Sequence, residues 1–159
     1  MSDGLVAIVA VVSALGSGLV AGIFFAFSTF VMAALARLRP DQGITAMQSI
    51  NVAVLNPWFF AAFFGTAAGC AVLAVLAALD WDRPDSALLL AGSLLYLAGT
   101  IGVTMAANVL RNNALARVGP ESTEGAELWA RYLSVWTAWN HVRTVASLAA
   151  ATLFILALR

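Results

Sequence analysis

Four long apolar stretches constrain the fold of this 159-residue chain more than any other feature. Crossing the hydrocarbon core of a bilayer takes about 20 predominantly apolar residues in a helix, and each stretch is long enough. Because a spanning segment has to satisfy its own backbone hydrogen bonds, they predict an all-α fold, a bundle of four transmembrane helices. We expect one integral membrane domain over residues 1–159, with helices at about 4–36, 57–79, 86–113 and 124–158.

The segment between the first two helices differs from a transmembrane span. Residues 41–55 are less apolar than the flanking stretches, Pro40 precedes them, and Asn56 and Pro57 follow them. This pattern predicts a short interfacial or re-entrant helix that lies at the membrane surface or folds back over the mouth of the bundle. Proline at position 57 suits the first turn of the second span.

Small residues recur every four positions in the first two spans. They occupy positions 14, 18, 22 and 26 in the first span and 61, 65 and 69 in the second. Faces of small residues let helices approach closely in lipid. We therefore expect these two spans to be direct neighbours.

The distribution of arginine predicts an orientation. The first loop carries Arg37 and Arg39 and the third carries Arg111 and Arg117, whereas the second has Arg83 among three aspartates. By the positive-inside rule, loops 1 and 3 face the cytoplasm and both termini lie outside, in the plasma membrane or the inner membrane of a bacterium. Eight basic and eight acidic residues balance, so the charge does not indicate a nucleic-acid partner.

The stretch WTAWNHVRT, residues 136–144, gathers the chain's only histidine with an asparagine and an arginine. Counting back about 20 residues from Arg159 places it near the cytoplasmic edge of the membrane core. Polar groups at this depth usually face the bundle interior or a cavity, which predicts a pocket open to the cytoplasm or inner leaflet. The same end of the bundle receives Gln48, Asn51, Asn56, Ser28, Thr29 and a four-spaced row of Thr100, Thr104, Asn108 and Asn112.

The helical period divides the stretch between two faces of the last helix. At 100° per residue, His141 lies on a different face from Asn140 and Arg143, so one small pocket does not readily hold all three. The face of Asn140 and Arg143 also carries Trp129, Tyr132, Trp136 and Ser147.

Several of these residues admit more than one role. His141 is a structural hydrogen-bonding imidazole, an acid–base catalyst, or a ligand of haem or a metal. A metal site is not favoured, because no second histidine, cysteine pair or carboxylate pair accompanies it. Arg143 either extends to lipid phosphates or binds an anionic oxygen of a ligand.

The aromatic and amide side chains are equally open to two interpretations. Trp136 and Trp139 belong either to the aromatic belt at the membrane surface or to a wall on which a ligand stacks. Asn108 and Asn112 either form hydrogen bonds between helices or line a ligand site.

The motifs FSTFVMAAL, AMQSIN, the NP pair at 56–57, GT-x3-T-x3-NVLRNNALA and W-x2-Y-x3-WTAWNHVRT together resemble the anthrone oxygenase-like family, over nearly the whole chain. Its members are small four-span membrane proteins, long grouped as a domain of unknown function. Fungal members are associated with the oxidation of polyketide anthrones to anthraquinones. The resemblance implies a cofactor-independent monooxygenase that uses dioxygen on an anthrone-like or other flat phenolic substrate.

The resemblance also implies roles for residues at matching positions. His141 becomes the candidate base, and Asn140 and Arg143 complete the candidate catalytic set as donors to an oxyanion. The candidates for stacking against the substrate rings are Trp136, Trp139, Phe27 and Phe30. The remaining substrate-binding candidates are amides: Gln48, Asn51, Asn56, Asn108 and Asn112.

Two other functions remain open. One is a non-enzymatic membrane protein that binds a small amphiphile or serves as a subunit of an assembly. The other is a haem- or quinone-linked redox protein, with haem held through His141. In the oxygenase interpretation we expect no cofactor and no metal. The expected partners are the lipid bilayer, a small hydrophobic aromatic substrate and a further copy of the chain in a homo-oligomer.

Overall fold

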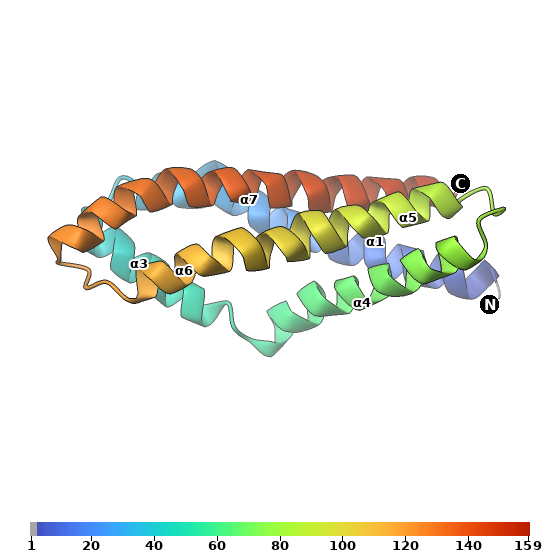
Figure 1. Cartoon of the computed structure of the whole chain (residues 1–159), viewed down its shortest axis with the longest axis horizontal. Coiled ribbons are helices and arrows are strands. Elements are labelled where there is room, and N and C mark those ends of the chain that lie inside the picture. Colours follow the sequence, from blue (N-terminus) through green and yellow to red (C-terminus); the bar gives the residue numbers. More distant parts are fainter. Residues whose placement is uncertain (1–2) are drawn as a thin grey trace.

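The computed structural model describes residues 3–159, and within that range it contains helices and no strand. Four helical stretches are long and apolar enough to cross a membrane: Gly4–Leu35, Pro57–Leu79, Ser86–Ala116 and Thr123–Ala157. They run up and down in sequence order, so that the start of the first and the end of the last lie at the same end of the bundle (Figure 1). The predicted all-α four-helix architecture is confirmed.

Two of the spans are interrupted by π-helical segments. The first span consists of α1 (Asp3–Ala26), η1 (Phe27–Val31) and α2 (Met32–Leu35), and the third of α5 (Ser86–Leu94), η2 (Leu95–Gly102), η3 (Thr104–Asn108) and α6 (Val109–Ala116). The second and fourth spans are single helices, α4 (Pro57–Leu79) and α7 (Thr123–Ala157). Such π-helical turns occur often at functional sites, and the sequence periodicity gave no sign of them.

The predicted short helix is α3 (Pro40–Ala53), which folds back over the end of the bundle where the first and third loops lie (Figure 1). It packs against α7 and α6. Gln48 ties it to the end of the third span, because its Nε2 donates to the carbonyl oxygens of Leu115 and Val118 at 2.8 and 3.2 Å. At the start of α3, Arg39 bonds Asp41 at 2.7 Å and holds the pKa of that carboxyl below its usual value.

Local capping sets the starts of the two uninterrupted spans. The side chain of Asn56 accepts a hydrogen bond of 3.0 Å from the backbone N–H of Phe59, and Pro57 occupies the first turn of α4. Ser122 caps α7 in the same way, accepting from the N–H of Gly125 at 2.9 Å. The chain therefore leaves α3 and turns back into the membrane at a defined residue.

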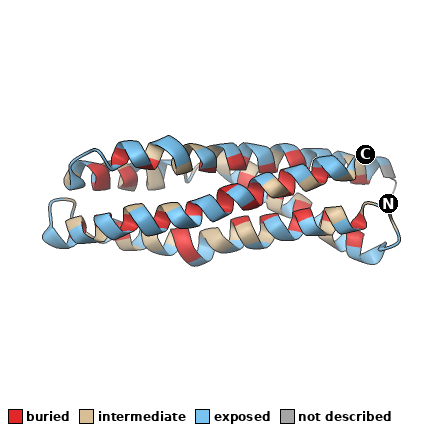
Figure 2. Cartoon of the chain, turned by 90° about the horizontal axis from the view of Figure 1, so that it is seen from above, coloured by how far each residue is buried: buried red, intermediate tan, exposed pale blue. Residues whose placement is uncertain are grey.

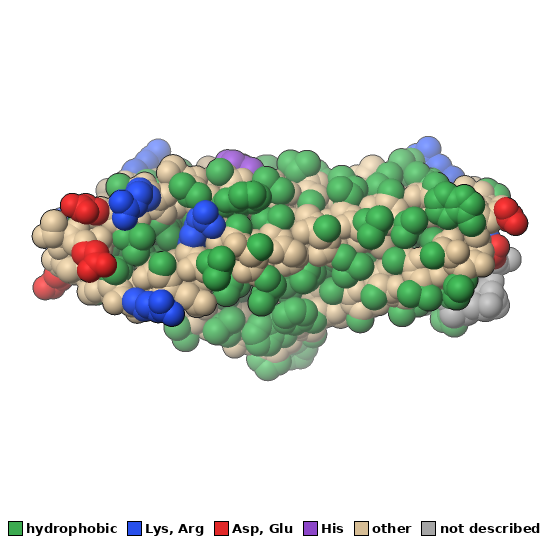
Figure 3. Space-filling view, viewed as in Figure 1, with side chains coloured by type: hydrophobic (Ala, Val, Ile, Leu, Met, Phe, Trp, Pro, Cys, Tyr) green, Lys and Arg blue, Asp and Glu red, His purple; other side chains and the backbone are tan. Residues whose placement is uncertain are grey.

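The spans close into a ring, because α1 packs against α4 and α7, and α5 also packs against α4 and α7. Buried residues form stripes along the helices and exposed residues cover the rest (Figure 2). Charged side chains gather toward the two ends, and hydrophobic side chains cover the surface between them (Figure 3). This distribution is that of an integral membrane protein.

The neighbouring positions of α1 and α4 confirm one prediction and correct another. A side chain at Gly16 would meet Thr66, and one at Gly69 would come within 2.5 Å of the Ser13 hydroxyl, so these helices do approach closely. However, Gly18, Gly22 and Gly65 face open space. The predicted four-residue ladder is therefore not the contact face in α1; the contact lies on an adjacent face of that helix.

A glycine also fixes the position of α3. A Cβ atom at Gly43 would lie 2.8–3.0 Å from the indole ring of Trp129 on α7. We expect Gly43→Val to push α3 off α7 and to destabilise the folded protein by about 1–3 kcal/mol. Thermal unfolding in detergent, with Gly18→Val as a control at an open position, measures the effect. Equal melting temperatures for the two variants would contradict this packing.

Candidate functional site

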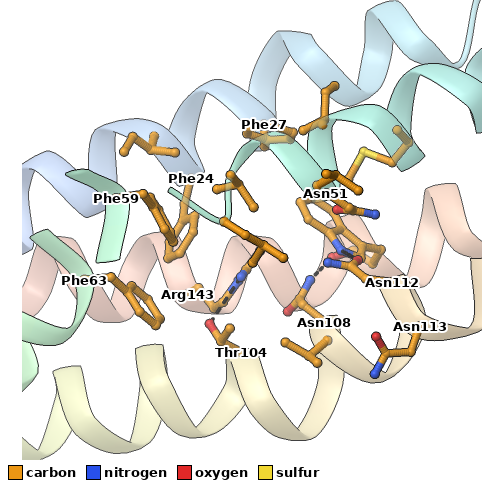
Figure 4. Close-up of a pocket in the computed structure, with 18 of the residues that line it drawn as sticks. Phe24, Phe27, Asn51, Phe59, Phe63, Thr104, Asn108, Asn112, Asn113 and Arg143 are labelled. Atoms are coloured by element: carbon orange, nitrogen blue, oxygen red, sulfur yellow. Dashed lines mark hydrogen bonds between the residues drawn. The ribbon is translucent and has the colours of Figure 1, made fainter. Parts of the chain in front are cut away.

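A cavity of about 610 Å³ lies at the end of the bundle covered by α3. Its walls come from all four spans and α3 (Figure 4). The volume is in the range of small-molecule sites, and most of the lining is apolar. The aromatic part of the wall consists of Phe24, Phe27, Phe59, Phe60, Phe63, Phe64 and Trp136.

The cavity opens sideways between the second and third spans. Some of its lining residues are exposed: Leu55 before α4, Phe64 on α4 and Met105 on η3. The start of α4 leans away from the other spans in this region (Figure 1). Phe64 and Met105 are hydrophobic and belong to spans long and apolar enough to cross a membrane, so the mouth opens on the apolar outer surface of the bundle.

A polar seam joins the third span to α7. The polar residues that recur every four positions in the third span all face α7, which confirms that they share one side of the helix. The hydroxyls of Thr100 and Ser147 lie 2.7 Å apart, and Arg143 Nη1 donates to Thr104 at 3.2 Å. Asn108 Nδ2 donates to the Trp136 carbonyl at 3.1 Å. Asn112 Oδ1 accepts from the Tyr132 hydroxyl at 2.7 Å and from Trp136 Nε1 at 2.8 Å.

Arg143 lines the cavity and points into the protein (Figure 4). It is only 5% exposed, so it does not extend to lipid headgroups. Its guanidinium carbon lies 4.1 Å from the ring centre of Phe24 and 5.2 Å from that of Trp136, where cation–π attraction holds it. Among the described residues, the ion pairs do not involve Arg143.

Asn140 lies behind the cavity wall and connects three groups. Its Nδ2 donates to the Phe24 carbonyl at 2.7 Å and to the Ser28 hydroxyl at 2.8 Å, and its Oδ1 accepts from Arg143 Nη2 at 2.6 Å. The side chain is fully buried. Asn140 therefore fixes α7 to the first span and sets the direction of the guanidinium.

Three polar atoms of cavity-lining residues have no hydrogen-bond partner among the described residues. They are Nε of Arg143, Nδ2 of Asn51 and Oδ1 of Asn108. Buried polar atoms in proteins are nearly always paired, so unpaired ones in a cavity wall call for an explanation. Two of the three are donors and one is an acceptor, and each of these atoms is itself covered within the wall.

Comparison with known protein families decides the classification. The sequence model described as anthrone oxygenase matches residues 56–153, more than half of the chain. The chain belongs to the anthrone oxygenase family. Membership indicates an oxygenase-type function. No significant match was found among curated proteins or among solved structures.

The family match covers α4, the whole third span and nearly all of α7. The seam and Arg143 therefore come from the matched region. The first span and α3 lie before it, and they complete the cavity of this anthrone oxygenase family member with Phe24, Phe27, Gln48 and Asn51.

The structure brings together some of the residues proposed from the sequence. Those that line the cavity are Phe27, Gln48, Asn51, Asn108, Asn112, Trp136 and Arg143. Asn140 contacts this group from behind. Phe24, Phe59 and Phe63 also line the cavity and were not predicted, because an apolar ring in a membrane span gives no signal that separates a cavity wall from a lipid contact. Thr104 was predicted only as a member of the polar row.

Other proposed residues lie elsewhere. Phe30, Trp139 and His141 are exposed and do not line the cavity. The purple imidazole is visible on the outer surface of the bundle (Figure 3). Asn56 serves as the cap of α4. The helical wheel had already separated His141 from Arg143, and the structure shows that the face of Arg143 is the one turned inward.

The position of His141 leads to a prediction about the expected base. We expect His141→Ala to leave the rate of substrate oxidation within about twofold of wild type, since His141 is exposed and does not line the cavity. The rate of oxygen uptake by the purified variant measures this. A loss of tenfold or more would show that His141 takes part in the reaction.

Proposed function

We propose that this protein is a membrane-embedded, cofactor-independent oxygenase that oxidises an anthrone-like or other flat phenolic substrate with dioxygen. The observation that carries the proposal is the aromatic-walled cavity with the guanidinium of Arg143 in its wall. Family membership supports the class of reaction. The sideways mouth supports a hydrophobic substrate that arrives through the bilayer.

The reaction balances without a cofactor. A methylene group between two aromatic rings and opposite a ketone loses a proton to water and leaves a carbanion delocalised onto the ketone oxygen. The carbanion transfers one electron to dioxygen, and the two radicals combine into a peroxide. The peroxide anion takes a proton back from water, and the resulting hydroperoxide loses water, which converts the methylene into a second ketone. One substrate and one dioxygen therefore give one quinone and one water.

In this proposal the chain supplies position and electrostatics. The rings of Phe27 and Trp136 hold the flat substrate by stacking. Arg143, Asn51 and Asn108 meet its oxygens, and donors fixed in advance stabilise the negative charge that develops there. Once the substrate has lost its proton, the apolar wall limits the access of water to the reactive intermediates. Asn140 is a positioning residue, because it acts through Arg143.

The full-length protein in detergent, treated with a metal chelator, tests the proposal. Oxygen uptake and quinone formation are followed together after addition of an anthrone. We expect both to exceed autoxidation in protein-free micelles, in a one-to-one ratio. Binding of the quinone without any oxygen uptake would instead support the non-enzymatic amphiphile-binding function.

A pair of adjacent substitutions tests whether the cavity is the site. Val109 lines the cavity, whereas Leu110 is exposed and does not. We expect Val109→Trp to fill part of the cavity and to lower kcat/KM at least tenfold, while Leu110→Trp stays within about twofold of wild type. Steady-state oxygen uptake measures both. Equal activity of the two variants would show that the reaction takes place elsewhere in the molecule.

A further inference from the structure

We propose that the cavity takes its ligand as an anion and that Arg143 is the counter-ion of an ionised oxygen on a flat aromatic molecule. The inference rests on the proposed function for the shape of the ligand. It goes further by naming the ionisation state that is bound and the residue that selects it.

The first support is the charge of the wall. Arg143 is the one cavity-lining side chain, among the described residues, that carries a charge near neutral pH. Its two contacts with oxygen are to neutral groups, the amide of Asn140 and the hydroxyl of Thr104. A buried cation at membrane depth is costly unless an anion offsets it, and such residues usually mark a functional site. Within the described chain nothing provides that anion, so the ligand is the natural source.

The second support is the geometry of the guanidinium. Arginine carries five N–H donors in a rigid fork that suits an oxygen anion, and the hydrogen bonds from Nη1 to Thr104 and from Nη2 to Asn140 use two of the five. Phe24 and Trp136 hold the guanidinium, and Asn140 fixes its direction. The group is thus held in place with a donor to spare, which is the arrangement of a preformed anion site.

The third support is the absence of a base in the described wall. The parts of α1, η1, α3, α4, η3 and α6 that line the cavity contribute apolar side chains, amides and a hydroxyl. The Tyr132 hydroxyl on α7 contacts the wall from behind and donates to Asn112. His141 lies outside. A substrate that has already lost its proton, or that loses it to water under the influence of Arg143, needs no base from the protein.

Binding of 2-hydroxyanthraquinone tests this inference without any turnover. The dye is flat, already oxidised, and its ionised form absorbs at longer wavelength, so a pH titration of its visible spectrum reports its pKa in the cavity. We expect the dye bound to the wild-type protein to have a pKa about 1–3 units below its value in protein-free micelles, since a cation within a few ångströms favours the ionised form by this amount. Each unit corresponds to a tenfold preference for the anion.

Three variants separate the charge of Arg143 from its packing. We expect Arg143→Gln to return the pKa of the dye to its value in micelles, and Arg143→Lys to keep the pKa below that value. Arg111→Gln should behave as the wild type, because Arg111 bonds the Ala107 carbonyl and does not line the cavity. The inference is overturned if the wild-type protein does not lower the pKa of the dye, or if Arg143→Gln lowers it equally.

The same measurements keep this inference apart from the proposed function. If the wild-type protein lowers the pKa of the dye but consumes no oxygen with an anthrone, the anion site is supported and the oxygenase function is contradicted. If the protein oxidises an anthrone but leaves the pKa of the dye unchanged, the oxygenase function is supported and the anion site is contradicted.

Discussion

Replacing Arg143 by glutamine is expected to lower kcat/KM for anthrone oxidation by about 100- to 1,000-fold, the usual cost of removing a fixed donor to an oxyanion. Glutamine retains an amide that can bond Asn140 or Thr104, but it removes the charge and the guanidinium fork. The loss therefore reports stabilisation of the substrate's negative charge. Steady-state oxygen uptake over a range of anthrone concentrations measures it.

Two comparisons make this result specific to the cavity. Arg143→Lys should recover part of the activity, because it restores the charge without the fork. Arg111→Gln removes an arginine from the third span at a position outside the cavity, and should stay close to wild type. If Arg143→Gln and Arg111→Gln were equally active, the guanidinium would have no part in the reaction.

Replacing Asn140 by aspartate is expected to lower the activity by a similar factor, although Arg143 remains. The Asn140 oxygen lies 2.6 Å from Arg143 Nη2, so a carboxylate there would form a buried ion pair with the guanidinium. An internal partner neutralises the charge that would otherwise meet the substrate. Ser28 can turn its hydroxyl toward the new acceptor, which preserves one of the bonds between α7 and the first span.

The spectrum of bound dye distinguishes this effect from misfolding. In Asn140→Asp the dye should still bind, and its pKa should return to the value in micelles. Ser134→Asp adds the same charge to an exposed position of α7 and should leave both activity and the pKa of the dye unchanged. If Asn140→Asp were as active as wild type, the cation of Arg143 would not act on the substrate.

Much of the site was accessible from the sequence because it depends on helical period and depth. The spacing of Asn108 and Asn112 placed them on one face of the third span, and both now bond α7. The wheel of the last helix placed Trp136, Asn140 and Arg143 together, and all three are buried. These inferences needed only the regular geometry of a helix and the cost of polar groups in lipid.

Other parts of the site were not accessible in this way. The π-helical segments η1 and η3, which carry Phe27 and Asn108, gave no signal in the sequence pattern. Motif resemblance gave His141 a role as base that its position outside the cavity does not support. Proximity in sequence to Asn140 is not proximity in space, because adjacent residues of a helix point about 100° apart.

The sequence by itself determined the four spans, the short helix between the first two, and the depth at which polar residues gather. These features follow from local hydrophobicity and helical period. Only the tertiary structure decided which apolar rings face the cavity. Phe24 and Phe63 line the cavity while Phe30 and Trp139 are exposed, yet all are aromatic residues in spans. In a membrane both the interior and the outer surface are apolar, so hydrophobicity cannot separate them; the outward lean of α4 and the cover of α3 do.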